Sequence, residues 1–305
     1  DAAEPRMVVT ADGYDDEAIA GAVYRHATAC LAPSSWIGCD LQAEPWKGRN
    51  AVFSPRVKAP KFMKQWQSLQ AKRIQGTDHE MEDATAPGYD IDLEFIGALG
   101  EPAYWYFTSN GSEPDGGASR WEMKTRNQGQ DFVRNRLRQL NRIVAARDVV
   151  AIVSGLTGRT VEDEAYKGKR SDESRTATGL TSPRFTDSVL AWCALWGMSS
   201  FPVIHRIMRV SVTAGAVPIG RFNPTHLVLP VLVGPRTLER WRAMVVSEQI
   251  IRAVTNTGDV AAGVPERAWL MAHGVRAILT FRFYVSDNSK APERSLGAGM
   301  LEVMT

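Results

Sequence analysis

The side chains best suited to chemistry in this sequence are basic ones, and they are gathered into blocks. Residues 51–76 carry six bases and no acid, and residues 120–147 carry eight bases and two acids. Residues 201–242 hold six arginines against one acid, Glu239. The planar fork of arginine binds phosphate through paired hydrogen bonds and stacks on bases. Blocks of one sign favour separate electrostatic faces, and the basic ones indicate phosphate partners such as nucleic acid.

One basic block has a regular spacing. Arg134, Arg138 and Arg142 stand four residues apart, so a helix over 132–147 would stack them along one side. Like charges at that spacing cost roughly a few tenths of a kcal/mol per pair, which an anionic partner would offset. Two partners stay open: the phosphate of a nucleic acid, or acidic residues elsewhere in the same chain.

Signatures of catalysis are missing from the sequence. It has no nucleophile elbow, no H-E-x-x-H helix, no Walker A sequence and no G-x-G-x-x-G fingerprint. His26, Cys30 and Cys39 could supply three zinc ligands, but their spacing matches no standard pair of zinc knuckles. A His and a Cys four residues apart on a helix usually serve packing, so we expect no catalytic residue, no metal and no other cofactor. If the chain were a nuclease, His26 or His79 would be the candidate general base.

The elements that must position these residues form a mixed set. Apolar spacing predicts helices over 15–31, 61–73, 132–147 and 237–254, and a buried helix that starts near 186. Apolar and alternating runs predict strands over 7–10, 103–108, 206–213, 227–233 and 276–285. Between these elements we expect an acidic stretch over 76–88, either a mobile loop or a junction between ordered pieces, and a basic flexible loop over 161–179.

The predicted fold class is therefore α+β, with mixed helices and antiparallel strands in two subdomains. Residues 1–119 form an N-terminal α/β portion with the acidic loop, and residues 120–305 hold the basic helix, the buried helix and a C-terminal sheet portion. Of the 305 residues 44% are hydrophobic and 23% are charged, which excludes a fibrous or wholly disordered chain.

The composition also bears on the compartment. Three cysteines cannot form a disulfide framework, and the acidic start does not look like a signal peptide, so we expect a cytoplasmic protein. The most apolar stretch, 189–204, is interrupted by Gly197 and Pro202 and is too short to span a membrane.

Three segments resemble proteins of type I CRISPR effector (Cascade) complexes. Residues 173–187, a polar basic loop, run into the apolar helix 190–198, as in the large-subunit family and especially its divergent form in subtype I-U (also called I-G). Residues 121–130, WEMKTRNQGQ, resemble the Lys-Thr and Asn-Gln segment of that family. Residues 294–303, RSLGAGMLEV, are similar to the glycine-rich loop of CRISPR repeat-RNA-binding proteins, in which glycines let the backbone approach RNA closely.

The resemblance implies a non-catalytic, nucleic-acid-binding subunit of an RNA-guided surveillance complex in antiviral defence. Such a large subunit contacts duplex DNA beside the target, in PAM recognition, and the guide RNA through basic helices and loops. The implied partners are guide RNA, target double-stranded DNA, other CRISPR effector subunits and a recruited nuclease-helicase, with no membrane. Two alternatives stay open: a subunit that binds or processes repeat RNA with a glycine-rich loop, and a scaffold that binds proteins only.

The expected nucleic-acid contacts combine the basic blocks with the family-like segments. They are Lys58, Lys61, Lys64, Lys124, Arg126, Asn127, Gln128, Arg134, Arg138, Arg142, Lys167, Lys169, Arg170 and Arg175, with Gly297 and Gly299 in the glycine-rich loop. Phosphate contacts supply affinity and position. Asn127 and Gln128 are candidates for base edges because side-chain amides pair with bases, or else they serve a turn beside Gly129.

Overall fold

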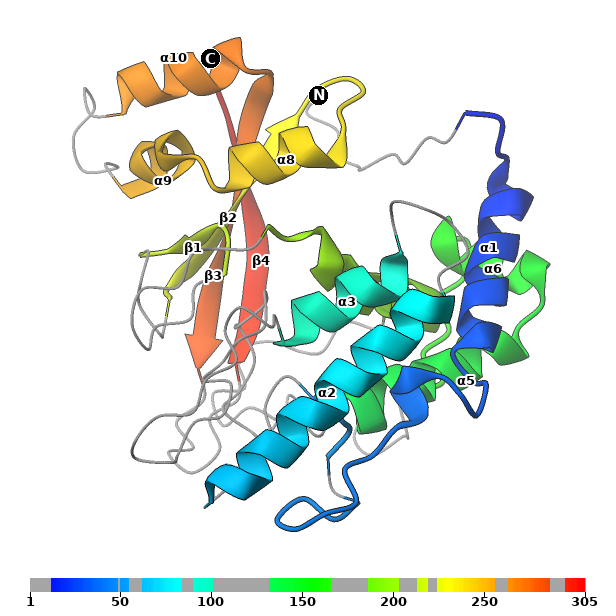
Figure 1. Cartoon of the computed structure of the whole chain (residues 1–305). Coiled ribbons are helices and arrows are strands. Elements are labelled where there is room, and N and C mark those ends of the chain that lie inside the picture. The colour runs from blue at the N-terminus through cyan, green and yellow to red at the C-terminus, as the bar shows by residue number, and fades with distance from the viewer. Residues whose placement is uncertain are drawn as a thin grey trace.

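Helices and an antiparallel sheet occupy separate parts of the molecule (Figure 1). The computed structural model describes residues 12–48, 50–54, 62–83, 90–100, 132–165, 186–202, 213–218, 224–255, 263–285 and 294–304. The helices that come early in the chain gather on one side of the molecule, and the sheet lies beside them with three later helices. The expected combination of helices with antiparallel strands is confirmed.

The helical part is built around one apolar cluster. Its elements are α1 (Asp16–Ala29), η1 (Trp36–Gly38), α2 (Met63–Asp83), α3 (Ile91–Gly100), a π-helical turn η3 (Val133–Leu137), α5 (Arg138–Ala146), α6 (Val149–Leu156), α7 (Ser188–Trp196) and η4 (Gly197–Ser200). Trp66, Phe95, Leu137 and Trp196 pack in this cluster, each at most 4% exposed. The cluster therefore takes residues from both sides of the expected boundary between 119 and 120, which itself lies outside the described residues.

Aspartates begin three of these helices. Asp15 accepts a hydrogen bond from the Ala18 amide at 2.8 Å, and Asp148 accepts one from the Ala151 amide at 2.7 Å. Asp187 does the same for the first turn of α7. Each carboxylate satisfies an amide that the first turn of a helix leaves unpaired, and it places negative charge at the positive end of the helix dipole. These caps are local, so the sequence near each aspartate is enough to set where the helix begins.

The sheet is a meander in which neighbouring strands are consecutive in the chain. β1 (Ala216–Val217), β2 (His226–Leu232), β3 (Val275–Val285) and β4 (Arg294–Val303) pair antiparallel in that order. Between β2 and β3 come α8 (Leu238–Val245), α9 (Glu248–Thr255) and α10 (Val264–Ala272), which group around one end of the sheet in Figure 1. Met244, Ile250 and Leu270 from these helices meet Val228 and Ile278 from the strands in a second apolar cluster.

An arginine joins the sheet part to the helical part. Arg242 on α8 donates a hydrogen bond to the Ser199 carbonyl at 2.8 Å and lies 3.6 Å from the Glu94 carboxylate on α3. Beside it, the rings of Phe201 and Trp241 meet edge to face with their centroids 5.4 Å apart. These contacts fix α8 against the helical part, and α8 in turn positions the arginines described below.

Two predicted boundaries are wrong. The acidic loop expected over 76–88 is helical as far as residue 83, because α2 continues through Gly76. A Cβ at Gly76 would lie 2.9 Å from the Phe53 ring, so this glycine serves a close packing contact and does not end the helix. The single helix expected over 237–254 is two, because the Ser247 hydroxyl accepts a hydrogen bond from the Ile250 amide at 3.4 Å and begins α9.

The other differences concern elements that were not expected. Helices α3, α6 and α10 lie in stretches for which no helix was predicted. The buried helix is confirmed as α7, with Val189, Trp192 and Trp196 inside, although Leu190 is 39% exposed. The strands expected over 7–10 and 103–108, and all but the last residue of the strand over 206–213, lie outside the described residues, as does the basic loop beyond residue 165.

The prediction of a glycine-rich loop over 294–303 is wrong, because this segment is strand β4. Gly299 pairs with Phe281 of β3. A Cβ at Gly299 would lie 2.8 Å from the Phe281 ring, and one at Gly297 would lie 2.7 Å from the Tyr284 ring. Both glycines therefore make room for aromatic rings of the neighbouring strand, which explains their presence by packing within the sheet.

Candidate functional site

The arginine stripe predicted over 132–147 forms, but two of its three members contact the protein itself. Arg138 on α5 donates hydrogen bonds to the Ile37 carbonyl at 2.5 Å and to the Asp40 carboxylate at 2.6 Å. The Arg134 Nε lies 3.3 Å from the same carboxylate. Arg142 is exposed. The anionic partner of Arg134 and Arg138 is thus an aspartate of this chain, and Arg142 is the member of the stripe that faces solvent.

Of the other predicted nucleic-acid contacts, the structure describes only Lys64, Gly297 and Gly299. Lys64 is exposed near the start of α2, and Gly297 and Gly299 lie in β4 as described above. The remaining predicted contacts lie outside the described residues: Lys58, Lys61, Lys124, Arg126, Asn127, Gln128, Lys167, Lys169, Arg170 and Arg175.

Arginines also hold buried polar networks together. Arg147, 8% exposed, donates hydrogen bonds to Glu164 at 2.8 Å and to the buried Asp187 at 2.9 Å. Arg73, 1% exposed, donates to the Val52 carbonyl at 3.0 Å. Several of the described arginines therefore support the fold, and only arginines that keep unpaired donors near solvent are candidates for binding a ligand.

Three such arginines surround one pocket beside the C-terminal end of α10. Arg236 precedes α8, Arg240 lies in the first turn of α8, and Arg276 lies in β3. They line a cavity of about 480 Å³ together with Thr237 and His273, and none of the described residues that line it is acidic. The volume falls in the range of small-molecule pockets.

The pocket arginines use only some of their N–H groups in hydrogen bonds to the protein. Arg240 donates to the His273 carbonyl at 3.2 Å, and Arg276 donates to the Met271 carbonyl at 3.0 Å. Arg236 donates to a neighbouring carbonyl at 2.9 Å. Each guanidinium carries five N–H groups. Within the described part of the chain, none of the three forms an ion pair with a carboxylate.

The charge balance leaves this pocket positive. The C-terminal end of α10 carries about half a negative charge, which is small beside three guanidinium groups. Glu239, next to Arg240 in the sequence, is exposed, and hydrogen bonds from its own backbone amide and from Thr237 lower its pKa. Its carboxylate therefore already has hydrogen-bond partners. An anion that enters the pocket would meet preplaced, charge-assisted donors.

The sequence analysis did not predict this pocket, although one of the basic blocks contains two of its three arginines. Arg236 and Arg240 belong to the basic block 201–242, which was recognised as basic but supplied no candidate residue. Arg276 stands in the alternating strand that follows α10, where one exposed basic residue is ordinary. Only the antiparallel return of β3 beside β2 brings the third arginine to the other two.

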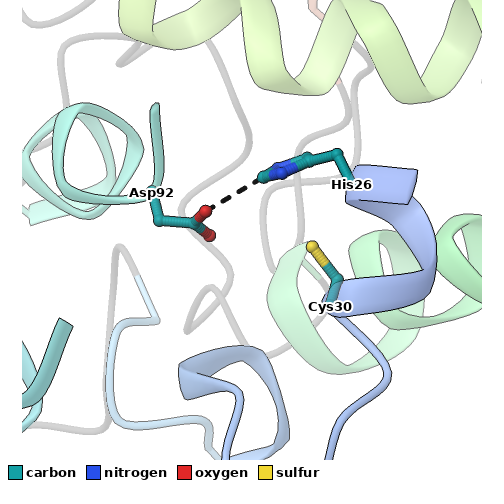
Figure 2. Close-up of side chains that lie close together, drawn as sticks. All are labelled: His26, Cys30 and Asp92. Carbon is teal, nitrogen blue, oxygen red and sulfur yellow. Dashed lines mark ion pairs between the residues drawn. The ribbon is translucent and has the colours of Figure 1, made fainter. Parts of the chain in front are cut away.

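A second group of reactive side chains lies at the C-terminal end of α1 (Figure 2). His26 and Cys30 stand four residues apart, and Asp92 at the start of α3 points toward them. The His26 Nε2, the Cys30 Sγ and an Asp92 carboxylate oxygen all lie within 4.8 Å of one another. Cys39, the third zinc ligand considered from the sequence, is exposed and lies outside this group.

Neighbouring aromatic residues orient this second group. The Trp36 indole donates a hydrogen bond to Asp92 Oδ1 at 2.7 Å, and the His26 ring meets the Trp196 ring edge to face at 4.4 Å between centroids. Burial raises the pKa of the Cys30 thiol and of the Asp92 carboxyl and lowers the pKa of His26. All three groups are thus biased toward their uncharged forms.

Comparisons with known proteins do not assign this arrangement to a family. No family model matches the chain, and neither a curated protein nor a solved structure matches it. Among the helices that the structure describes, none has both the length and the apolar character needed to cross a membrane. The functional conclusion therefore depends on the two sites themselves.

Proposed function

We propose that this chain is a non-catalytic nucleic-acid-binding protein whose pocket at Arg236, Arg240 and Arg276 holds the phosphate backbone. The observation that carries this proposal is the convergence of three arginines on one pocket whose described lining has no acid. Backbone carbonyls at the end of α10 hold two of the guanidinium groups in place. A positively charged site that is already assembled loses little conformational entropy when an anion binds.

A phosphodiester is the anion that matches these groups. The guanidinium fork pairs with two phosphate oxygens, and the pocket offers room for one phosphate with its flanking sugar. Exposed Arg142 and Lys64 add basic positions on α5 and α2, where a longer strand could be held. Phosphate contacts of this kind give affinity without reading the base sequence.

The larger assembly is proposed from the resemblance of residues 121–130, and of residues 173–187 with the helix 190–198, to the large-subunit family. It makes the chain a subunit of a type I CRISPR surveillance complex, most like the large subunit of subtype I-U/I-G. Its partners would be guide RNA, target double-stranded DNA, other effector subunits and a recruited nuclease-helicase in the cytoplasm. Residues 121–130 and nearly all of 173–187 lie outside the described residues, so this step depends on sequence alone.

Native purification tests this proposal directly. The chain is purified with the products of its neighbouring genes, and the nucleic acid that it retains is sequenced. Short RNAs with a constant, repeat-derived end are expected. A preparation without nucleic acid, whose assembly is unchanged by nuclease treatment, would contradict the proposal and favour the protein-only scaffold.

An RNA-processing subunit is the second candidate, and one residue favours it. His273 lines the arginine pocket, where a general base would need to be, and its ring stacks on Trp269 with centroids 3.7 Å apart. Incubation of the purified chain with repeat RNA separates the two candidates. Intact RNA supports binding only, whereas cleavage that His273→Ala abolishes would make the chain a nuclease.

A further inference from the structure

We propose that His26, Cys30 and Asp92 bind one zinc ion, which ties the C-terminal end of α1 to the start of α3. The three donors are an imidazole nitrogen, a thiol sulfur and a carboxylate oxygen, which are the ligand types that zinc takes in proteins. The site is separate from the arginine pocket, and it does not depend on the nucleic-acid function.

The spacing of the donors is close to what a zinc ion needs. Zinc bonds of about 2.0–2.3 Å at tetrahedral angles place neighbouring donors roughly 3.3–3.7 Å apart. Here the three donor atoms lie within 4.8 Å of one another, and His26 Nε2 is 3.8 Å from Asp92 Oδ2. Side-chain movements of about an ångström would therefore bring the donors to zinc-binding distances.

One donor atom has no other task in the fold. His26 Nε2 is buried and makes no hydrogen bond to the described residues, and its distance to Asp92 is too long for one. A buried polar atom without a partner costs free energy, and native proteins rarely leave one. A metal ion bonded to this nitrogen would supply the missing partner.

The carboxylate is oriented as metal-binding carboxylates usually are. The Trp36 indole holds Asp92 Oδ1, and this leaves Oδ2 on the side of His26. Hydrogen bonds of this kind to a ligand fix its direction and tune its affinity for the metal. The Trp192 and Trp196 rings pack against the His26 ring and restrict its rotation in the same way.

The charges of this donor set suit a doubly charged ion. Zinc binding displaces the Cys30 thiol proton to solvent, together with the Asp92 carboxyl proton wherever that group is protonated. The thiolate and the carboxylate then balance the two positive charges of zinc, while the imidazole stays neutral with its proton on Nδ1. A neutral complex is the form that a half-buried site tolerates best. A thiolate and an imidazole also favour zinc or cobalt over magnesium or calcium.

The surroundings are acidic as well. Asp90 and Glu80 are close enough that their negative charges act on His26 and Cys30 respectively. They favour a cation at this position, and His26 and Asp92 are each about a fifth exposed in their side chains, so the site lies close to the surface. The described residues supply three donors, which leaves the fourth tetrahedral position for water.

Cobalt substitution tests the site by spectroscopy. The untagged, full-length chain is stripped with a chelator, dialysed and titrated with Co²⁺, and the near-ultraviolet band of a cobalt–thiolate bond is recorded. One equivalent of cobalt with this band is expected for the wild type. Competition with a chromophoric chelator then gives the zinc affinity.

Matched variants separate ligation from packing. Cys30→Ala is expected to abolish the thiolate band, and Cys39→Ala, at the exposed cysteine, is expected to retain it. Trp36→Phe removes only the indole donor and is expected to weaken zinc binding about 10–100-fold. Asp92→Asn, which keeps the shape of the side chain and its contact with Trp36, is expected to weaken it further.

Each contrary result would overturn the proposal. These results are a wild-type protein without the cobalt–thiolate band, a band that survives Cys30→Ala, or a zinc affinity that Asp92→Asn leaves unchanged. Thermal denaturation adds a readout that needs no spectrum, since a ligand that binds only the folded state raises the melting temperature. Zinc is expected to raise it in the wild type and in Cys39→Ala, but not in Cys30→Ala.

Discussion

Removing the three pocket arginines is expected to weaken nucleic-acid binding and to make it less sensitive to salt. The triple variant Arg236→Ala, Arg240→Ala and Arg276→Ala deletes three positive charges that form no ion pair with a carboxylate of the described residues. Each neutralised phosphate contributes about 0.9 to the slope of log affinity against log salt on duplex DNA. If each arginine holds one phosphate, the slope becomes shallower by about 2.7.

That change in slope is large over an ordinary range of salt. When salt rises from about 50 to about 200 mM, the affinity of the intact protein should fall about 40-fold more than that of the variant. Fluorescence anisotropy with a short labelled duplex and with a single-stranded RNA, at several salt concentrations, measures both slopes. Circular dichroism checks the fold, because two of the lost side chains also bond carbonyls at the end of α10.

A charge-matched control distinguishes the pocket from net charge. Arg25, Arg159 and Arg252 are exposed and do not line the pocket, so their triple alanine variant removes the same charge elsewhere. We expect the control to keep the wild-type slope. A folded pocket variant with the wild-type slope would refute the reasoning, and so would an equal loss in both triple variants.

Three further predictions follow from the buried polar groups and the cysteines. Arg147→Ala should lower the free energy of unfolding by about 3–5 kcal/mol, because it leaves the buried Asp187 carboxylate without its ion-pair partner. In the same denaturant titration, the control Arg159→Ala should change the free energy of unfolding by less than about 0.5 kcal/mol. Burial would raise the pKa of Glu164, but hydrogen bonds, above all from Arg147, outweigh it and lower this pKa below its ordinary value of 4.5. The stability that this carboxylate contributes is therefore present above pH 4.5 and is lost as the pH falls through its folded pKa, so Glu164→Gln should flatten the acid side of a melting-temperature series. Iodoacetamide should modify the exposed Cys39 before Cys193, whose pKa burial raises to about 11, and peptide mass spectrometry would reveal the reverse order if this is wrong.

Elements whose signals are local could be predicted from the sequence. The spacing of Leu137, Leu140 and Val144 on one face predicts the helix that η3 and α5 form, and all three are buried. Aspartate caps likewise predict the starts of α1 and α7, an apolar run predicts β2, and alternating apolar residues predict β3. In each case the deciding residues lie within about one or two turns, or on one strand.

Elements decided by distant contacts were predicted wrongly or missed. α2 continues past Gly76 because the Phe53 ring packs on that glycine from another part of the chain. Residues 294–303 form a strand because β3 pairs with them and its rings cover Gly297 and Gly299. Glycine content alone indicated a loop, since the pairing partner is not visible in the segment itself.

The basic blocks, the four-residue spacing of the arginine stripe and the shared helix face of His26 and Cys30 can all be read from the order of residues. Three features depend on the folded chain: Asp40 neutralises part of the stripe, Arg276 joins Arg236 just before α8 and Arg240 on α8, and Asp92 completes the donor set. These features could not be predicted because charge pairing and metal ligation depend on distances through space and on burial. Packing between helices and strands far apart in the chain sets both of these quantities.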